Sequence, residues 1–199
     1  MRFVTALSFL GLSVSPPAQT PVQVAQFHAI EAGNGAHVTV RYGTTQRVTI
    51  VKGSREYSRI TVTRGGTLLI DKCPDHCPRG YELEIEIVTP ILSSVSLTSG
   101  GRIEGRGTFP RQAEIDVDVA HGGTIDIRPL VVDRVTASVN QGGRILTVSE
   151  TSLVATVNQG GFIAYWGHAK VSSSISHGGV VTEGDPRQIS TPLSDVDQE

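Results

Sequence analysis

The sequence predicts an all-β protein, a right-handed parallel β-helix-like solenoid with Gly-Gly corners. Between Ser93 and Glu183 a Gly-Gly pair recurs five times, with successive first glycines 22, 20, 18 and 18 residues apart, a period typical of stacked coils. The flanking residues alternate between apolar and polar, as in strands with one buried face. Aromatic residues make up only 5% of the chain, whose Val, Ile and Thr content suits strands. The pairs are Gly100-Gly101, Gly122-Gly123, Gly142-Gly143, Gly160-Gly161 and Gly178-Gly179.

The residues on either side of the glycines fall into matching columns when the copies are aligned. The column three residues before the pair holds Leu97, Val119, Val139, Val157 and Ile175, and the column three after holds Ile103, Ile125, Ile145, Ile163 and Val181. Similar residues in successive copies indicate stacking in register, so that each copy covers the apolar face of its neighbour. Glycine suits the corner because it adopts positive φ without a Cβ clash. The alternative is an antiparallel β-sandwich or barrel in which each Gly-Gly forms a hairpin turn.

The chain divides into a leader, a linker, one domain and a tail. Residues 1–18 have a positive start at Arg2 and an apolar stretch from Phe3 to Val14, which together predict a signal peptide. We expect a linker at 19–26, a single β-solenoid domain at 27–185, and a polar, disordered tail at 186–199. No later segment has the length and apolarity of a transmembrane helix. A secreted or periplasmic protein of the bacterial envelope is therefore expected.

Charge and motifs argue against several classes of function. The formal net charge is −2, and no cluster of Lys and Arg suggests nucleic acid binding. The Gly-Gly pairs open strands and not helices, unlike a phosphate-binding loop, and no nucleophile-elbow motif is present. The sequence therefore indicates no catalytic residue, no cofactor and no metal site.

The order of segments resembles a known family. Phe27 to Ile30, Arg47 to Val51 and Leu83 to Pro90 precede the glycine-pair copies that begin at Ser93. Together they are similar to the bacterial family of putative auto-transporter adhesins with a head GIN domain, over roughly 27–184. The resemblance implies a β-solenoid fold in an envelope or secreted protein, with no established enzymatic activity. Many members have Gly-Ser-Gly-like corners, where this chain has Gly-Gly after Ser, His or Gln.

Two cysteines, Cys73 and Cys77, are the only ones in the chain. Export to an oxidising compartment favours a disulfide between them, which would pin a small loop between two strands. The alternatives are free thiols, or a metal site formed with His76. A structural zinc site needs four ligands, and the sequence offers no second ligand pair.

The polar column before the glycines suggests a structural role. Stacking places Asn140 over Asn158 and Gln141 over Gln159, and amides at strand spacing can hydrogen-bond along a stack. His121 and His177 lie in the same column as Gln141 and Gln159, three coils apart. At about 4.8 Å per coil they are too distant to share a metal in a solenoid, although a meander could bring them together.

The outward faces of the strands are the expected interaction surface, with Trp166, Asp116 and Asp118 as its candidates. An exposed Trp could stack on a sugar, whereas a covered one would pack under a loop or the tail. The partner would be a cell-surface glycan or protein. The alternative function is a polysaccharide-active lyase or hydrolase using the carboxylates around Asp116, Asp118 and Asp126, with Glu104 sharing an offset with Asp126. A third is a structural unit that forms homo-oligomers through its open ends.

Overall fold

The computed structural model describes residues 19–188, which form an all-β structure with two short 3₁₀ helices. The fold class expected from the alternating pattern is thus confirmed at this level. The strands in the first part are β1 (Thr20–Val22), β2 (Ala29–Gly33), β3 (His37–Tyr42), β4 (Arg47–Lys52), β5 (Ser58–Val62), β6 (Thr67–Lys72) and β7 (Glu84–Thr89). Those in the second part are β8 (Ser94–Leu97), β9 (Arg102–Arg106), β10 (Gln112–His121), β11 (Thr124–Gln141), β12 (Arg144–Gln159), β13 (Phe162–Trp166), β14 (Lys170–Ile175) and β15 (Val180–Glu183). The 3₁₀ helices are η1 (Arg55–Tyr57) and η2 (Pro186–Gln188).

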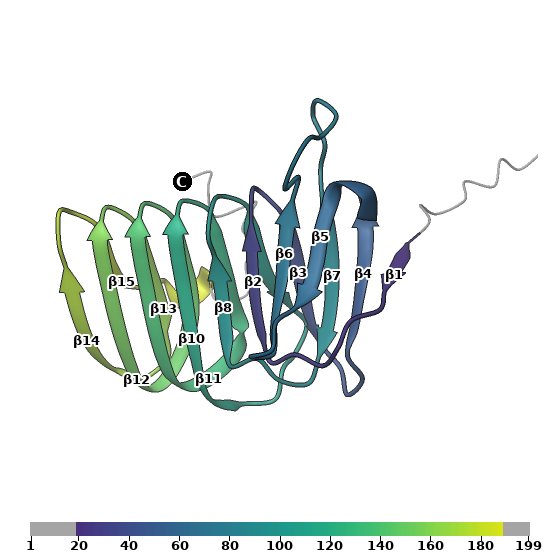
Figure 1. Ribbon diagram of the computed structural model, residues 1–199. Helices are drawn as coiled ribbons and strands as arrows, with labels where there is room; N and C mark the ends of the chain where they lie inside the picture. The colour runs from purple at the N-terminus through teal and green to yellow at the C-terminus, as the bar shows by residue number, and fades with distance from the viewer. Residues whose placement is uncertain (1–18, 189–199) are drawn as a thin grey trace, which may run out of the picture.

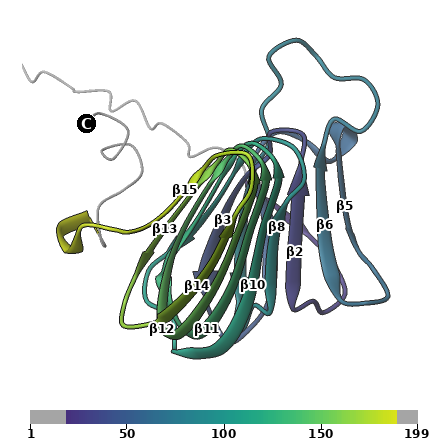
Figure 2. The ribbon, with the colours of Figure 1, turned by 90° about the vertical axis from the view of Figure 1, so that its left-hand side faces the viewer.

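The strands form two facing ladders within one folded sheet, as Figure 2 shows from the end of the stack. The first ladder has the order β1-β4-β7-β3-β9-β11-β12-β13-β15, and the second has the order β5-β6-β2-β8-β10-β11-β12-β14. The long strands β11 and β12 belong to both ladders because each bends from one to the other. In β11 this bend coincides with register shifts between Asp126 and Arg134.

The glycine-pair copies pair in parallel and in the register that their columns indicate. In the second ladder Ile115 pairs with Val135, Val135 with Leu153 and Leu153 with Val171. In the first ladder the column after the glycines pairs in the same way, from Ile103 through to Val181. Figure 1 shows these strands side by side along the molecule.

Antiparallel pairs occur at the N-terminal end of the stack, where the glycine repeat is absent. Strand β4 pairs antiparallel with β1 and β7, and β5 pairs antiparallel with β6. The structure also corrects the expected linker at 19–26, because residues Thr20–Val22 form β1. Val22 is buried, and Pro21 is tolerated because β1 is an edge strand, where proline removes no ladder bond.

The main core lies between the two ladders and is made of the inward-facing aliphatic columns. Val119, Val139 and Val157 are fully buried in the second ladder, as are Ile125 and Ile145 in the first. Each glycine-pair copy leaves its apolar edge to be covered by the next copy, so burial depends on the paired copies as a whole.

The structure does not describe residues 1–18 and 189–199. The expected signal peptide at 1–18 and most of the expected tail at 186–199 are outside the described residues, while 186–188 form η2. Between residues 19 and 188 there is no helix with the length and apolarity needed to cross a membrane.

Candidate functional site

A charged groove lies on the outer face of the first ladder, where β7, β3 and β9 are neighbours. Its volume is about 370 Å³. We call the charged groove the surface formed by the side chains of His37, Thr39, Arg41, Glu84, Glu86, Arg102, Glu104 and Arg106. These residues occupy every second position of their strands. Their side chains therefore all point outward, because successive residues of a strand face opposite sides of the sheet. The inward residues between them, such as Val38 and Ile85, belong to the core.

The glutamates of the charged groove hold its arginines in place. Glu104, whose side chain is 17% exposed, accepts hydrogen bonds from Arg102 at 3.1 Å and from Arg106 at 2.8 Å. Glu86 accepts one from Arg41 Nε at 3.0 Å. A guanidinium carries five N–H donors in a rigid fork, so these bonds orient each arginine without using all of its donors.

Two of these arginines stand directly opposite each other. Arg41 of β3 pairs in register with Arg106 of β9, and their side chains are 47% and 55% exposed. Like charges opposite each other on neighbouring strands destabilise a sheet. Here each arginine is paired with its own glutamate, Arg41 with Glu86 and Arg106 with Glu104, which offsets this repulsion. A carboxylate or sulfate group between the two would bridge both guanidinium groups.

Trp166 does not lie on an open surface. This corrects its candidate role as an interaction residue and agrees with the alternative that a loop or the tail covers it. The side chain faces outward from the first ladder but is only 5% exposed. It packs with Leu146, Val148 and Ala164 in a second apolar cluster. The chain after β15 covers it, and the indole Nε1 donates a hydrogen bond to the carbonyl oxygen of Asp185 at 2.8 Å.

Asp126 is likewise covered, which corrects its assignment to a solvated carboxylate face. It is 7% exposed, and both its carboxylate oxygens accept hydrogen bonds from Arg128, at 2.9 Å from Nε and 2.6 Å from Nη2. Arg128 also donates to the carbonyl oxygen of Gln188 and lies 5.3 Å from the centre of the Trp166 ring. The buried ion pair thus holds the C-terminal segment against the first ladder.

That segment encloses a smaller pocket of about 270 Å³ between itself and the strands β12 and β13. Leu146, Phe162, Ala164 and Trp166 supply its apolar lining, and Arg144 stacks over the Phe162 ring at 5.4 Å. The outer face of the first ladder therefore changes from the charged groove at β7-β3-β9 to an apolar surface at β12-β13.

The C-terminal segment should loosen at acid pH. Arg187 donates hydrogen bonds to the Asp185 carboxylate from its side chain and its backbone N–H, and these lower the pKa of Asp185 from 3.8 to about 2. Because the folded-state pKa is depressed, the stabilisation is complete above pH 3.8 and is lost as the pH falls towards 2. Trp166 is the only tryptophan, so its fluorescence reports on the covering segment.

We therefore expect a fluorescence transition of Trp166 with a midpoint near pH 2. In Arg187→Ala the midpoint should move up towards 3.8, the ordinary pKa of the carboxyl. Far-UV circular dichroism measured in parallel separates local loosening from global unfolding. An identical midpoint in both proteins would contradict this role of the pair.

Asp116 and Asp118 lie on the outer face of the second ladder, and so on the opposite side from Asp126 and Glu104. Asp116 is exposed, whereas Asp118 is half-buried beside Asn140, whose Nδ2 lies 3.5 Å from its Oδ1. Asp126 and Glu104 pair in register as their shared offset indicates. The three aspartates considered for polysaccharide chemistry are therefore not brought together.

The amide ladder is present in one of its two expected columns. Asn158 Nδ2 donates to Asn140 Oδ1 at 2.6 Å. Gln141 and Gln159 pair in register through their backbones, but no hydrogen bond joins their side chains, which are both exposed. Solvent competes for those amides at the rim, so register alone does not create a ladder there.

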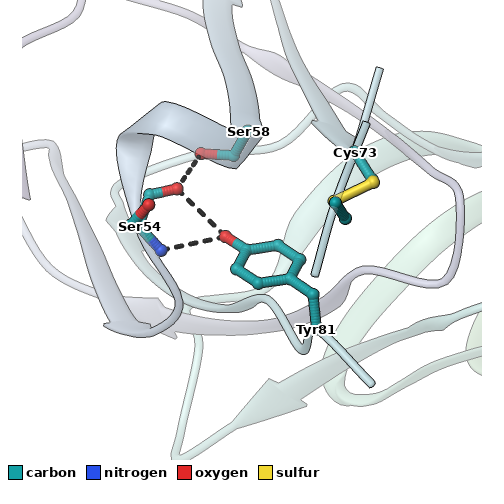
Figure 3. Close-up of a disulfide and its surroundings, with 5 residues drawn as sticks. Ser54, Ser58, Cys73 and Tyr81 are labelled. Carbon is teal, nitrogen blue, oxygen red and sulfur yellow. Dashed lines mark hydrogen bonds between the residues drawn. A yellow bond between two sulfur atoms is a disulfide. The ribbon is translucent and has the colours of Figure 1, made fainter. Parts of the chain in front are cut away.

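Cys73 and Cys77 form a disulfide, which confirms the pairing expected from the sequence. Their loop follows β6 and protrudes beyond the strand ends in Figure 1. Nearby, the Tyr81 hydroxyl donates to the carbonyl oxygen of Ser54 at 3.0 Å and accepts from the Ser54 N–H at 2.9 Å (Figure 3). These bonds fix the return of the chain from the loop to β7.

His121 and His177 do not approach each other. His121 pairs in register with Gln141, which pairs with Gln159, so further coils separate the two rings. The Nδ1 of His121 lies 3.0 Å from the carbonyl oxygen of Thr98. Over residues 19–188 no group of three or more His, Cys, Asp or Glu side chains has the geometry of a metal site.

Sequence reasoning missed the charged groove. The sequence contains one indication of it. The outward position two residues after the first glycine of a pair is an arginine in two of the copies, Arg102 and Arg144. The other groove strands, β3 and β7, lie outside the repeat. Their register against β9 cannot be read from the sequence because β4 to β6 and the disulfide loop intervene.

Comparison with known proteins gives one family match. A family model described as "Putative auto-transporter adhesin, head GIN domain" matches residues 26–161. No curated protein matches the chain.

Several solved structures align with most of this chain. A putative adhesin from Bacteroides fragilis aligns with a TM-score of 0.53 and 18% identity, covering 83% of this chain and 95% of that one. A putative lipid binding protein from Parabacteroides distasonis has a TM-score of 0.38 and 15% identity, covering 84% and 96% of the two chains. A putative adhesin from Parabacteroides merdae has a TM-score of 0.34 and 13% identity over the same shares. The alignment with the Bacteroides fragilis protein supports a common fold.

Proposed function

Because the chain belongs to the family of putative auto-transporter adhesins with a head GIN domain, we propose that it is a non-enzymatic, adhesin-like interaction module. It acts outside the cell or in the cell envelope, as a secreted or periplasmic protein. The family and the Cys73–Cys77 disulfide support this location, since disulfides persist in oxidising compartments. The parallel copies make up its scaffold, a right-handed β-solenoid, and their in-register pairing supports that description.

The partner is an acidic cell-surface glycan that binds in the charged groove. The observation that carries this proposal is the pair Arg41 and Arg106, two exposed guanidinium groups directly opposite each other. A carboxylate or sulfate of the glycan would bridge the two guanidinium groups through bidentate hydrogen bonds. Glu84 and Glu86 supply acceptors for sugar hydroxyl groups along the same groove.

Binding should depend on this pair of arginines. We expect the purified chain to bind carboxylated or sulfated glycans on an array. The double variant Arg41→Ala/Arg106→Ala should bind the same glycans at least about tenfold more weakly, which is a loss of about 1.4 kcal/mol in binding free energy. The matched control is Arg111→Ala. Arg111 is similarly exposed, at 59%, and is paired with Asp133 away from the groove.

The array also separates the competing partners and surfaces. Binding that survives the double variant but fails in Asp116→Asn/Asp118→Asn would move the site to the second ladder. Retention of matrix proteins with no glycan bound would make the partner a protein. Cleavage of a polysaccharide that is lost in Asp118→Ala would replace the proposal by the alternative, a polysaccharide lyase or hydrolase.

A further inference from the structure

The last strand of the second ladder, β14, leaves the end of the core open. All six of its residues are exposed, including Val171 at 38% and Ile175 at 48%. The residues that precede them in the same columns, Leu153 and Val157, are fully buried at 0%. Figure 1 shows β14 at the end of the stack. The inward columns of the core thus end on an uncovered apolar edge.

The backbone of β14 is also unpaired on its outer side. The N–H of Ser176, just after the strand, bonds to the carbonyl oxygen of Val157 in β12. Because N–H and C=O directions alternate along a strand, the backbone groups of Val171, Ser173 and Ile175 point away from β12. Among the described residues, β12 is the only strand that pairs with β14.

The opposite end of the stack carries features that discourage pairing, and β14 does not. Strand β1 is three residues long and contains Pro21, and β5 presents Arg59 to solvent. Short strands, proline and charged side chains are the usual protection of a sheet edge. Strand β14 has the sequence Lys-Val-Ser-Ser-Ser-Ile. Its only charged residue is Lys170, at the first position, and it contains no proline. An interface that uses the same end of both molecules is closed and two-fold, whereas head-to-tail stacking would need both ends open.

We propose that β14 pairs with β14 of a second copy of this chain, antiparallel, with the two-fold axis at Ser173. In this register Ser173 faces Ser173 of the second copy, and Val171 faces its Ile175. These residues have outward backbone groups, so each facing pair exchanges both N–H···O bonds. Their side chains continue the core across the axis, and Lys170 faces a serine and not another charge. This dimer is independent of glycan binding in the charged groove.

The other candidate for this edge is the segment 189–199 of the same chain. The described chain ends at Gln188, whose carbonyl oxygen is bonded to Arg128 on the outer face of the first ladder. Strand β14 belongs to the second ladder. The segment therefore starts on the other side of the molecule, and a second copy is the better occupant.

Sedimentation velocity on the purified chain, measured over a range of concentrations, tests the proposal. We expect a reversible dimer for the native chain and a monomer for Ser173→Pro. Proline at this position removes an N–H that points away from β12, so the internal ladder is kept. The matched control is Ser173→Val, which changes the same side chain but retains the N–H and should remain a dimer. Circular dichroism establishes that both variants are folded.

Cysteine cross-linking tests the register. Residues in a hydrogen-bonded antiparallel pair have Cα atoms about 5.5 Å apart, which is within the range that a disulfide spans. Ser173→Cys should therefore give a covalent dimer on mild oxidation, whereas Ser172→Cys, which faces Ser174 of the second copy, should not.

Three results would overturn the proposal. The first is a native chain that stays monomeric at every concentration. The second is a dimer that Ser173→Pro leaves intact. The third is a monomeric native chain that dimerises only after removal of 189–199, which would assign the edge to that segment.

Discussion

Replacing Asp126 by alanine is expected to destabilise the protein by about 3–5 kcal/mol, because it leaves the Arg128 guanidinium buried without its carboxylate. The side chains of Arg128 and Asp126 are only 3% and 10% exposed. Water therefore cannot replace the two hydrogen bonds that Asp126 accepts from the guanidinium. The C-terminal segment should loosen at the same time, since Arg128 also holds the carbonyl oxygen of Gln188.

Urea unfolding followed by far-UV circular dichroism measures this loss. The control is Asp133→Ala, which breaks the ion pair with Arg111, where the side chains are 59% and 32% exposed. An exposed pair of this kind contributes about 0–1 kcal/mol. Equal losses in the two variants would show that the Asp126–Arg128 pair is not desolvated.

Replacing both members of the buried pair separates the cost of a lone charge from the value of the pair. In Asp126→Leu/Arg128→Met both charges are removed and apolar groups fill the space. Such replacements are often neutral or stabilising, so the double variant should be more stable than Asp126→Ala. If it is no more stable, the loss in Asp126→Ala comes from packing and not from the uncompensated charge.

The sequence predicts the register of the stack well, because the register depends on local patterns. The apolar column Val119, Val139 and Val157 and the corner glycines recur at nearly fixed spacing, and in-register pairing is the arrangement that buries every copy. The alternation also gives the correct direction for Trp166 and Asp126, both of which face outward from the first ladder. For Trp166 the sequence leaves two alternatives, an open surface or cover by a loop or the tail, and the structure has the covered one. For Asp126 the expected solvated face is wrong.

The sequence does not decide whether Trp166 and Asp126 are exposed, because the segment that covers them has no alternation of apolar and polar residues. Residues 184–188 are mostly polar and lie beyond the last strand, so nothing in their sequence indicates that they fold back over β13. The structure does explain one residue of this segment, Gly184. A Cβ on Gly184 would lie 2.1 Å from the Trp166 ring, so glycine is needed where the chain crosses the indole. The antiparallel pairing of β4 and β5 escaped prediction for a similar reason, since these strands lie outside the repeat.

The corner glycines fill two different physical roles, and alanine substitution should separate them. Gly122 has φ of +68°, and a Cβ added to it meets nothing within 4 Å. Gly123 has φ of +92°, and its Cβ would lie 2.8 Å from the carbonyl oxygen of Gly101 and 3.0 Å from the carbonyl carbon of Gly100 in the preceding coil. The first glycine is needed only for its conformation, whereas the second is also needed for the close approach of two backbones.

Gly122→Ala should therefore cost about 1–2 kcal/mol, the penalty of a left-handed conformation for an L-residue. Gly123→Ala should cost about 3 kcal/mol or more, because backbone atoms of the preceding coil must also move. Urea unfolding of the two variants, which differ by one position in the same corner, measures the difference directly. Equal costs would mean that neighbouring coils can separate at the corner without loss, and that the second glycine is not what sets their spacing.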